Sequence, residues 1–251
     1  MKKYLSACVF VCLALVATQV FADDEVDKVL LAIGFEPFGG DKTNGSWEAV
    51  KYLNGKRFMD TKVVTAQLPV IWDKASIQLQ ELIRQYKPTA VVCFGQAESD
   101  WVRLETTARN ERAKIPDNDG VIPENMFIYS QAPPTLETGL PLAEIEGNLR
   151  LANIPVKISP TAGTYLCNDT FYNLMFNPGT EDAKTMMRGF VHVPQIKTKI
   201  VSFESKQRYF TKSVLHKAAE IIVKTVIAVN NRKLSAKLNS EPQITHRLTG
   251  S

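Results

Sequence analysis

"KVLLAI", at residues 28–33, is a short apolar run that ends at Gly34. This pattern is typical of a buried β-strand that leads into a loop. It returns in AVVCF, residues 90–94, which ends at Gly95. Both runs predict buried strands, and the segments around them indicate how these strands are connected.

Segments with helical spacing alternate with the apolar runs. The first opens at Ser46, which is suited to cap a helix, and the second stops at Lys87-Pro88. From 98 to 141 the pattern loosens around several prolines. Helices are expected at 46–53, 73–86, 142–151 and 210–229, and further strands at 62–68 and 190–193. This alternation predicts an α/β domain with helices layered around a largely parallel sheet.

The N-terminus has the layout of a secretory signal peptide. Lys2 and Lys3 precede an apolar run, and Val20-Phe21-Ala22 offers small residues at the two positions that a signal peptidase reads. A retained membrane anchor is disfavoured because the run is short for a bilayer span of roughly 20 residues. We therefore expect a signal peptide at 1–22, cleavage after Ala22, and export to the periplasm or the medium.

The rest of the chain is expected to form one domain, residues 23–232, followed by a polar, aperiodic and disordered tail, residues 233–251. The 30 basic and 26 acidic residues nearly balance and are scattered, which gives no electrostatic case for nucleic acid. No other apolar run is long enough to span a membrane, so no membrane partner is expected after signal cleavage.

Cys167 is the first candidate for chemistry. It lies in AGTYLCND, residues 162–169, where a turn is expected to pass into a helix. Unpaired backbone N–H groups at a helix start favour the thiolate form of a cysteine, and the N–H of Cys167 itself could hold a developing oxyanion. The alternative is a small buried hydrophobic residue, which is what most free cysteines are.

His192 is the natural partner of a thiol nucleophile. Of the three histidines, His216 falls in the last predicted helix and His246 in the predicted tail, whereas His192 ends a buried strand beside Pro194. An imidazole there could act as base and acid, although a core histidine explains the pattern equally well. A third group should orient the imidazole. The pattern alone does not choose among the candidate carboxylates Glu98, Asp100, Glu105, Asp117 and Asp119.

Four unusual segments each follow an apolar run. They are GFEPFGG at 34–40, residues 95–110, the turn at Cys167, and HVP at 192–194. In sheets of this type functional groups gather at the carboxyl ends of the strands, so we expect the four segments to meet.

Taken together and in this order, four motifs resemble the pyroglutamyl peptidase I family of cysteine peptidases. They are GFEPFGG followed by Asn44 and Ser46-Trp47, VRLETTARN followed by IPDNDG, AGTYLCN, and GFVHVP. The resemblance implies a catalytic set of Glu105, Cys167 and His192. It also implies a three-layer α/β/α sandwich around a largely parallel, mixed central sheet.

The resemblance further implies an enzyme that removes N-terminal pyroglutamate from peptide substrates, without a metal or another cofactor. The family's aromatic pocket for the flat pyrrolidone ring maps onto Phe35 and Phe38, with Tyr165 close to the nucleophile and Asn44 near the substrate. Phe35 and Phe38 could otherwise be plain core residues. Family members often associate, so a homo-oligomer stays open.

Two departures from the family pattern stand out. ESDW, residues 98–101, replaces a Gly-Gly-Arg segment and is one residue shorter. The family's arginine lies near its active site, and Arg103 is the residue that could substitute for it here. Gly45 replaces a proline, a change expected to matter less.

These departures leave two rival functions open. One is an exported relative that binds pyroglutamyl or other cyclic ends with a changed or lost reaction. The other is a different thiol amidase or acyltransferase on the same scaffold. In an oxidising compartment Cys93 could also form a reversible bridge with Cys167, because it ends a strand two residues before Gly95.

Overall fold

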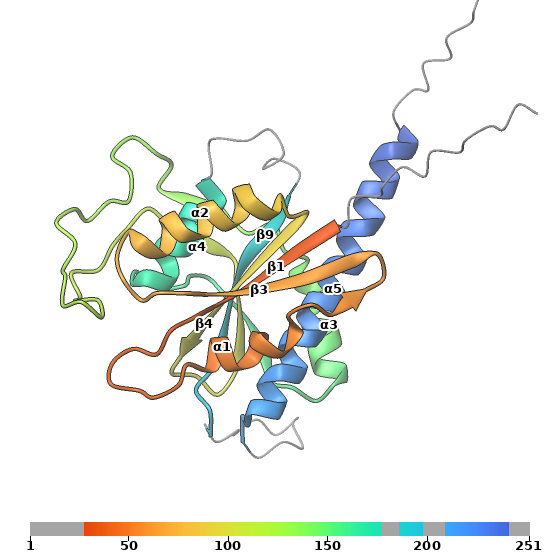
Figure 1. The fold of residues 1–251 in the computed structure, drawn as a ribbon, viewed down its shortest axis with the longest axis horizontal. Coiled ribbons are helices and arrows are strands. Elements are labelled where there is room, and N and C mark those ends of the chain that lie inside the picture. Colours follow the sequence, from red (N-terminus) through yellow and green to blue (C-terminus); the bar gives the residue numbers. More distant parts are fainter. Residues whose placement is uncertain (1–27, 177–185, 198–208, 241–251) are drawn as a thin grey trace, which may run out of the picture.

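A seven-stranded sheet forms the centre of the molecule (Figure 1), in a computed structural model that describes residues 28–176, 186–197 and 209–240. The strand order is β2-β3-β1-β4-β9-β5-β8. The bounds are β1 Lys28–Phe35, β2 Arg57–Phe58, β3 Thr61–Leu68, β4 Ala90–Ala97, β5 Val102–Glu105, β8 Val156–Ser159 and β9 Met187–Pro194. A separate two-stranded sheet joins β6, Thr107–Arg109, to β7, Thr135–Glu137.

The sheet is mostly parallel but mixed, as predicted. Strands β3, β1, β4 and β9 pair in parallel, and so do β5 and β8. Two junctions are antiparallel: β2 with β3, and β5 with β9. At the second junction, β5 runs in the direction opposite to β9.

Helices cover both faces of the sheet. Helix α1 is Gly45–Val50, continued by a 3-10 turn at Lys51–Leu53; the others are α2 Lys74–Tyr86, α3 Leu142–Leu151, α4 Leu166–Phe176 and α5 Lys212–Ser240. Helices α1, α3 and α5 pack together, and α2 packs with α4 (Figure 1). The opening run of β1 explains the arrangement, because Leu30 and Ala32 join one core cluster while Leu31 and Ile33 join the other. The predicted three-layer sandwich is confirmed.

Short strands account for most of what the pattern missed. Strands β5 to β8 have three or four residues each and lack long apolar runs, so periodicity did not predict them. The expected end of a strand at Gly95 was also wrong. Strand β4 continues to Ala97, because β9 pairs with it along its whole length.

Asn44, rather than Ser46, caps helix α1. Its Oδ1 accepts from Ser46 N at 2.9 Å and from Ser46 Oγ at 2.8 Å. The Ser46 hydroxyl oxygen also accepts from Phe35 N at 3.0 Å. The prediction of a serine cap was therefore wrong, and Ser46 ties the start of α1 to the end of β1.

Helix α5 runs further than its amphipathic pattern predicted. It continues past 229 to Ser240, so the prediction of disorder was wrong for residues 233–240. Burial accounts for the helix up to Asn231, since Asn230 and Asn231 are only 4% and 8% exposed and Asn231 Nδ2 donates to Asp60 Oδ1. Residues 232–237 are largely exposed, so their polar pattern did not indicate that the helix continues. The predicted signal peptide and the remainder of the predicted tail, residues 241–251, lie outside the described residues.

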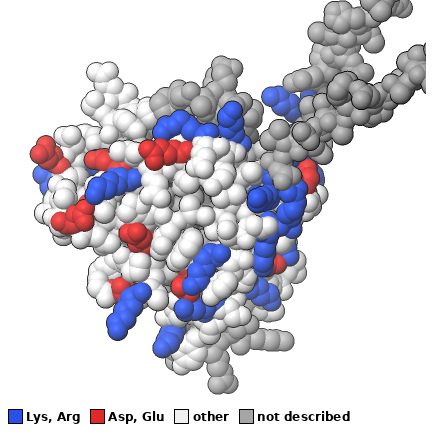
Figure 2. Space-filling model, viewed as in Figure 1, with Lys and Arg blue, Asp and Glu red and all other residues white. Residues whose placement is uncertain are grey.

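The surface carries charges of both signs. Figure 2 shows Lys and Arg side chains interspersed with Asp and Glu on the face drawn, as the scattered charges of the sequence indicate. Within the described ranges, no helix is both long enough and apolar enough to cross a bilayer.

Candidate active site

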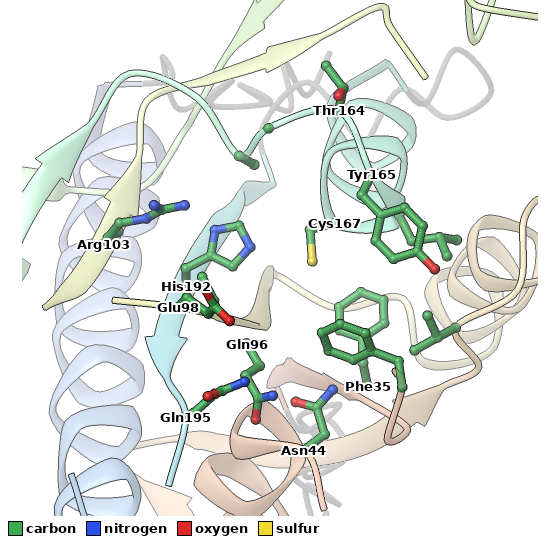
Figure 3. A pocket seen from close by; sticks show the side chains of 16 residues that line it. Phe35, Asn44, Gln96, Glu98, Arg103, Thr164, Tyr165, Cys167, His192 and Gln195 are labelled. Atoms are coloured by element: carbon green, nitrogen blue, oxygen red, sulfur yellow. The ribbon is translucent and has the colours of Figure 1, made fainter. Parts of the chain in front are cut away.

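Three side chains from three different elements meet on one face of the sheet. Cys167 is the second residue of α4, His192 lies on β9, and Glu105 is the last residue of β5. His192 Nδ1 lies 2.8 Å from Glu105 Oε1, and the two residues are 3% and 0% exposed. The Cys167 sulfur and the His192 ring face each other in Figure 3. The three residues that the resemblance grouped are thus neighbours in space.

Strand β5, which is antiparallel to β9, brings Glu105 close to His192. In the antiparallel pairing of β5 with β9, Arg103 stands opposite His192. Because side chains alternate along a strand, Arg103 and Glu105 point to the same face of the sheet. Both side chains therefore lie on the side where the imidazole is.

Gly95 leaves room for the nucleophile. It pairs with His192 across β4 and β9. A Cβ at this position would lie 2.9 Å from Cys167 Sγ and 2.8 Å from the Phe190 ring, closer than real Cβ contacts. Only glycine fits here without moving the sulfur or the ring.

The electrostatics of the pair favour a charged imidazole. Burial alone would lower the pKa of His192, but the Cys167 sulfur and the Glu105 carboxylate outweigh it and raise this pKa to about 9. The ring is therefore positively charged at neutral pH. With Nδ1 bonded to Glu105, the other ring nitrogen is available to the sulfur.

Arg103 joins the same carboxylate. Its Nε lies 3.2 Å from Glu105 Oε1, the oxygen that also bonds His192. The other oxygen, Glu105 Oε2, is buried and has no hydrogen-bond partner among the described residues. Arg103 therefore supplies a positive charge beside the buried carboxylate. It is the residue that the sequence offered as a substitute for the arginine missing from 98–101.

The other carboxylates that the sequence left open are placed elsewhere. Asp117 accepts from Trp72 N at 2.9 Å, and Asp119 pairs with Lys74 at 3.2 Å. Glu98 lines the pocket but is exposed, and Asp100 does not line it. Glu105 is thus the candidate that contacts the imidazole.

A pocket of about 360 Å³ opens in front of Cys167. Phe35, Phe38 and Tyr165 line it, with the Phe38 and Tyr165 ring centroids 6.4 Å apart. Tyr165 is held in place by Trp72, which meets it edge-on at 5.3 Å, and by a hydrogen bond from its hydroxyl to Pro116 O at 3.0 Å. The three rings form an aromatic wall of the pocket, and two contacts anchor Tyr165 in it.

Asn44 also lines this pocket, although most of its side chain is already engaged. Its Oδ1 caps α1, and its Nδ2 donates to Glu36 O at 2.8 Å. One amide hydrogen of Asn44 is left over for a ligand.

Gln96 is a pocket residue that sequence reasoning missed. Its Oε1 accepts from Gly45 N at 2.6 Å, and its Nε2 donates to Asp41 Oδ2 at 3.2 Å. A proline at position 45 has no N–H, so the Gly45 departure creates this bond. A Cβ at Gly45 would also lie 2.8 Å from Pro194 O. The glycine at position 45 therefore affects a pocket residue, Gln96, although the sequence analysis expected this departure to matter little.

Polar side chains after Cys167 hold the start of α4. Asn168, fully buried, accepts from Arg109 N at 2.9 Å and donates to Arg109 O and Glu111 O at 2.8 and 2.9 Å. Asp169, also fully buried, pairs with Arg112 at 2.6 Å. Asn168 and Asp169 directly follow Cys167 in the sequence, and this was the feature from which their positioning role could have been predicted.

Cys93 and Cys167 are free thiols in this structure, and the reversible bridge between them stays a hypothesis. Cys93 is fully buried, and its burial together with the nearby Cys167 raises the pKa of its thiol well above the ordinary value. Among the described residues, no group of three or more His, Cys, Asp and Glu side chains is placed to hold a metal ion.

A family model described as pyroglutamyl peptidase matches residues 27–230. The chain belongs to this family. It is 33% identical over 205 residues to a pyrrolidone-carboxylate peptidase of Bacillus cytotoxicus, covering 80% of this chain and 94% of that protein. The chain is therefore a cysteine-type hydrolase of the pyroglutamyl peptidase family, as the motifs predicted.

Solved structures agree in fold. Pyroglutamyl peptidase I of Bacillus amyloliquefaciens is 34% identical, with a TM-score of 0.73 over 81% of this chain and 98% of that one. The pyrrolidone carboxyl peptidase of Thermococcus litoralis is 32% identical, with a TM-score of 0.73 over 82% and 96%.

Substituting Gly95→Ala tests the space around the sulfur. The new Cβ pushes Cys167 Sγ away from His192, so we expect the rate of Cys167 alkylation by iodoacetamide at pH 7 to fall about tenfold or more, because the imidazolium no longer stabilises the thiolate. Mass spectrometry of the labelled peptide gives this rate, and circular dichroism checks the fold. An unchanged alkylation rate in a folded variant would show that Gly95 does not control the position of the sulfur.

Proposed function

We propose that this chain hydrolyses the bond that follows an N-terminal pyroglutamyl residue, using Cys167 as nucleophile, His192 as acid and base, and Glu105 as the orienting group. The observation that carries the proposal is the 2.8 Å contact of His192 Nδ1 with the buried Glu105, beside a cysteine at a helix start. Each group then has a defined task in acyl transfer.

In the first half-reaction the Cys167 thiolate attacks the carbonyl carbon of the pyroglutamyl residue. The carbonyl oxygen becomes an oxyanion, and the N–H of Cys167 donates to it, because the first N–H groups of a helix lack intrahelical acceptors. His192 gives its proton to the leaving nitrogen as the C–N bond breaks. The products are a thioester on Cys167 and a peptide with a free amino terminus.

In the second half-reaction water attacks the thioester. The now neutral His192 takes a proton from this water, the C–S bond breaks, and pyroglutamate leaves with the thiolate restored. Throughout, Glu105 keeps the ring nitrogen Nδ1 protonated and the other nitrogen facing the sulfur.

The pocket suits a pyrrolidone ring better than an ordinary amino terminus. Phe35, Phe38 and Tyr165 give flat apolar surfaces for the ring, and the spare amide hydrogen of Asn44 is available to a ring carbonyl. A free N-terminal glutamate would bring an ammonium group and a carboxylate against this wall. Burying those charges without partners is costly, so such peptides are excluded. The comparisons give no support to a binding protein that lacks turnover.

Turnover of a fluorogenic pyroglutamyl amide by reduced protein tests the roles of the three residues. We expect Cys167→Ala to lose on the order of 10⁴- to 10⁶-fold in kcat, since no nucleophile remains, and Glu105→Gln on the order of 10²- to 10⁴-fold, since the imidazolium loses its partner. Cys93→Ala makes the same change at a buried cysteine outside these roles and should keep most of the activity. Turnover that survives in Cys167→Ala would refute the mechanism.

The pKa of His192 sets the alkaline limit of activity. Because this pKa is raised from 6.5 to about 9, the imidazolium persists through neutral pH and is lost as pH rises through about 9. We therefore expect kcat/KM to fall with an apparent pKa near 9. In Glu105→Gln one cause of the raised pKa is gone, so the alkaline limb should move to lower pH. An alkaline limb at the same pH in both proteins would contradict this assignment.

We also propose that the mature chain begins at Asp23 after export. The support is the charged, apolar and small-residue layout of residues 1–22. Expression of the full chain in a bacterial host, fractionation and N-terminal sequencing should give Asp23 at the start of the exported protein. Recovery only in the cytoplasm with the first 22 residues intact would refute export.

A further inference from the structure

The pocket has two unlike walls on either side of Cys167. Figure 3 shows Phe35 and Tyr165 on one side of the sulfur, and Arg103, His192, Glu98 and Gln195 on the other. The aromatic wall offers apolar surface. The polar wall, formed by Glu98, Arg103, His192 and Gln195, offers charge and hydrogen bonds.

The position of His192 indicates which part of the substrate contacts each wall. In the mechanism proposed above, on which this inference rests, His192 protonates the leaving nitrogen. The leaving peptide therefore departs on the His192 side, and the residue after pyroglutamate contacts the polar wall. The pyrrolidone ring occupies the aromatic side.

Glu98 is the uncompensated charge on the polar wall. Arg103 and His192, the two basic side chains of this wall, both contact the buried Glu105. Glu98 is exposed, and within the described ranges no hydrogen bond or ion pair to its side chain is found. A substrate side chain at this wall therefore meets a carboxylate that no described basic side chain pairs with.

Glu98 lies at the start of a short connection between two strands of the sheet. Glu98 follows β4 directly, and only residues 98–101 connect β4 to β5. Within this connection the Ser99 hydroxyl donates to Trp101 O at 2.9 Å and accepts from Trp101 N at 3.1 Å. This short connection places Glu98 in the lining of the pocket.

We propose that Glu98 selects pyroglutamyl peptides whose second residue is Lys or Arg. An exposed carboxylate about 5 Å from a cationic side chain gives a modest attraction, so the preference in kcat/KM should be about threefold to tenfold over an uncharged side chain of the same length. The same charge disfavours Glu at this position to a similar extent. Since the pair is exposed to solvent, salt should weaken both effects.

Matched peptide amides isolate the charge. The kcat/KM for pyroglutamyl-lysine amide is compared with that for pyroglutamyl-norleucine amide, and the glutamate peptide with the glutamine peptide, in 50 mM and 500 mM NaCl at pH 7.5. The wild type should favour Lys over norleucine about threefold to tenfold in low salt, and the ratio should move towards one in high salt. A ratio of one in low salt would overturn the proposal.

Two variants locate the effect. Glu98→Gln should bring the Lys-to-norleucine ratio close to one. Asp100→Asn makes the same change of charge two residues away, off the pocket wall, and should change the ratio less than twofold. A ratio that survives in Glu98→Gln, or that falls equally in Asp100→Asn, would overturn the assignment to Glu98.

A binding measurement separates this proposal from the proposed function. If neither the Lys nor the norleucine peptide is cleaved, the proposed function is wrong. The dissociation constants of the two peptides with Cys167→Ala then decide the preference. Tighter binding of the Lys peptide, lost in Cys167→Ala/Glu98→Gln, supports the role of Glu98, and equal binding overturns it.

Discussion

One carboxylate oxygen holds the site together. Glu105 Oε1 accepts from His192 Nδ1 at 2.8 Å and lies 3.2 Å from Arg103 Nε, in a residue with no solvent exposure. A buried carboxylate is tolerated only when charged or hydrogen-bonded partners offset its desolvation. Both partners bind Oε1, while Oε2 has no described partner. The bond that offsets part of the desolvation therefore also orients the imidazole.

The sheet topology makes this arrangement possible. The antiparallel pairing sets Arg103 opposite His192 and leaves Glu105 on the same face. On the nucleophile side, buried Asn168 fixes the start of α4, and Gly95 leaves space for the sulfur. Sheet and helix thus position the reacting groups from opposite sides.

The altered 98–101 segment changes the charges around the pocket without dismantling it. The arginine that the resemblance led us to expect there is absent, and Arg103 brings a guanidinium to Glu105 from the following strand. The same segment introduces Glu98 at the pocket mouth. Gly45 similarly replaces a proline and gives an N–H bond to Gln96. The departures therefore fall on the polar part of the pocket, while the aromatic wall keeps the expected residues.

Local sequence determined the elements whose signals lie between near neighbours. The apolar run of β1, the spacing of α2 and the turn before Cys167 predicted their structures because burial on both faces and helix initiation depend on adjacent residues. The sequence pattern indicated Cys167 and His192 as candidate catalytic residues, but only the resemblance to a family selected Glu105 among the carboxylates. Tertiary structure decided the short strand β5, the bond of Arg103 to Glu105, and the length of α5. These features depend on register between segments far apart in the chain, such as Glu105 and His192, 87 residues apart, and no local periodicity encodes that pairing.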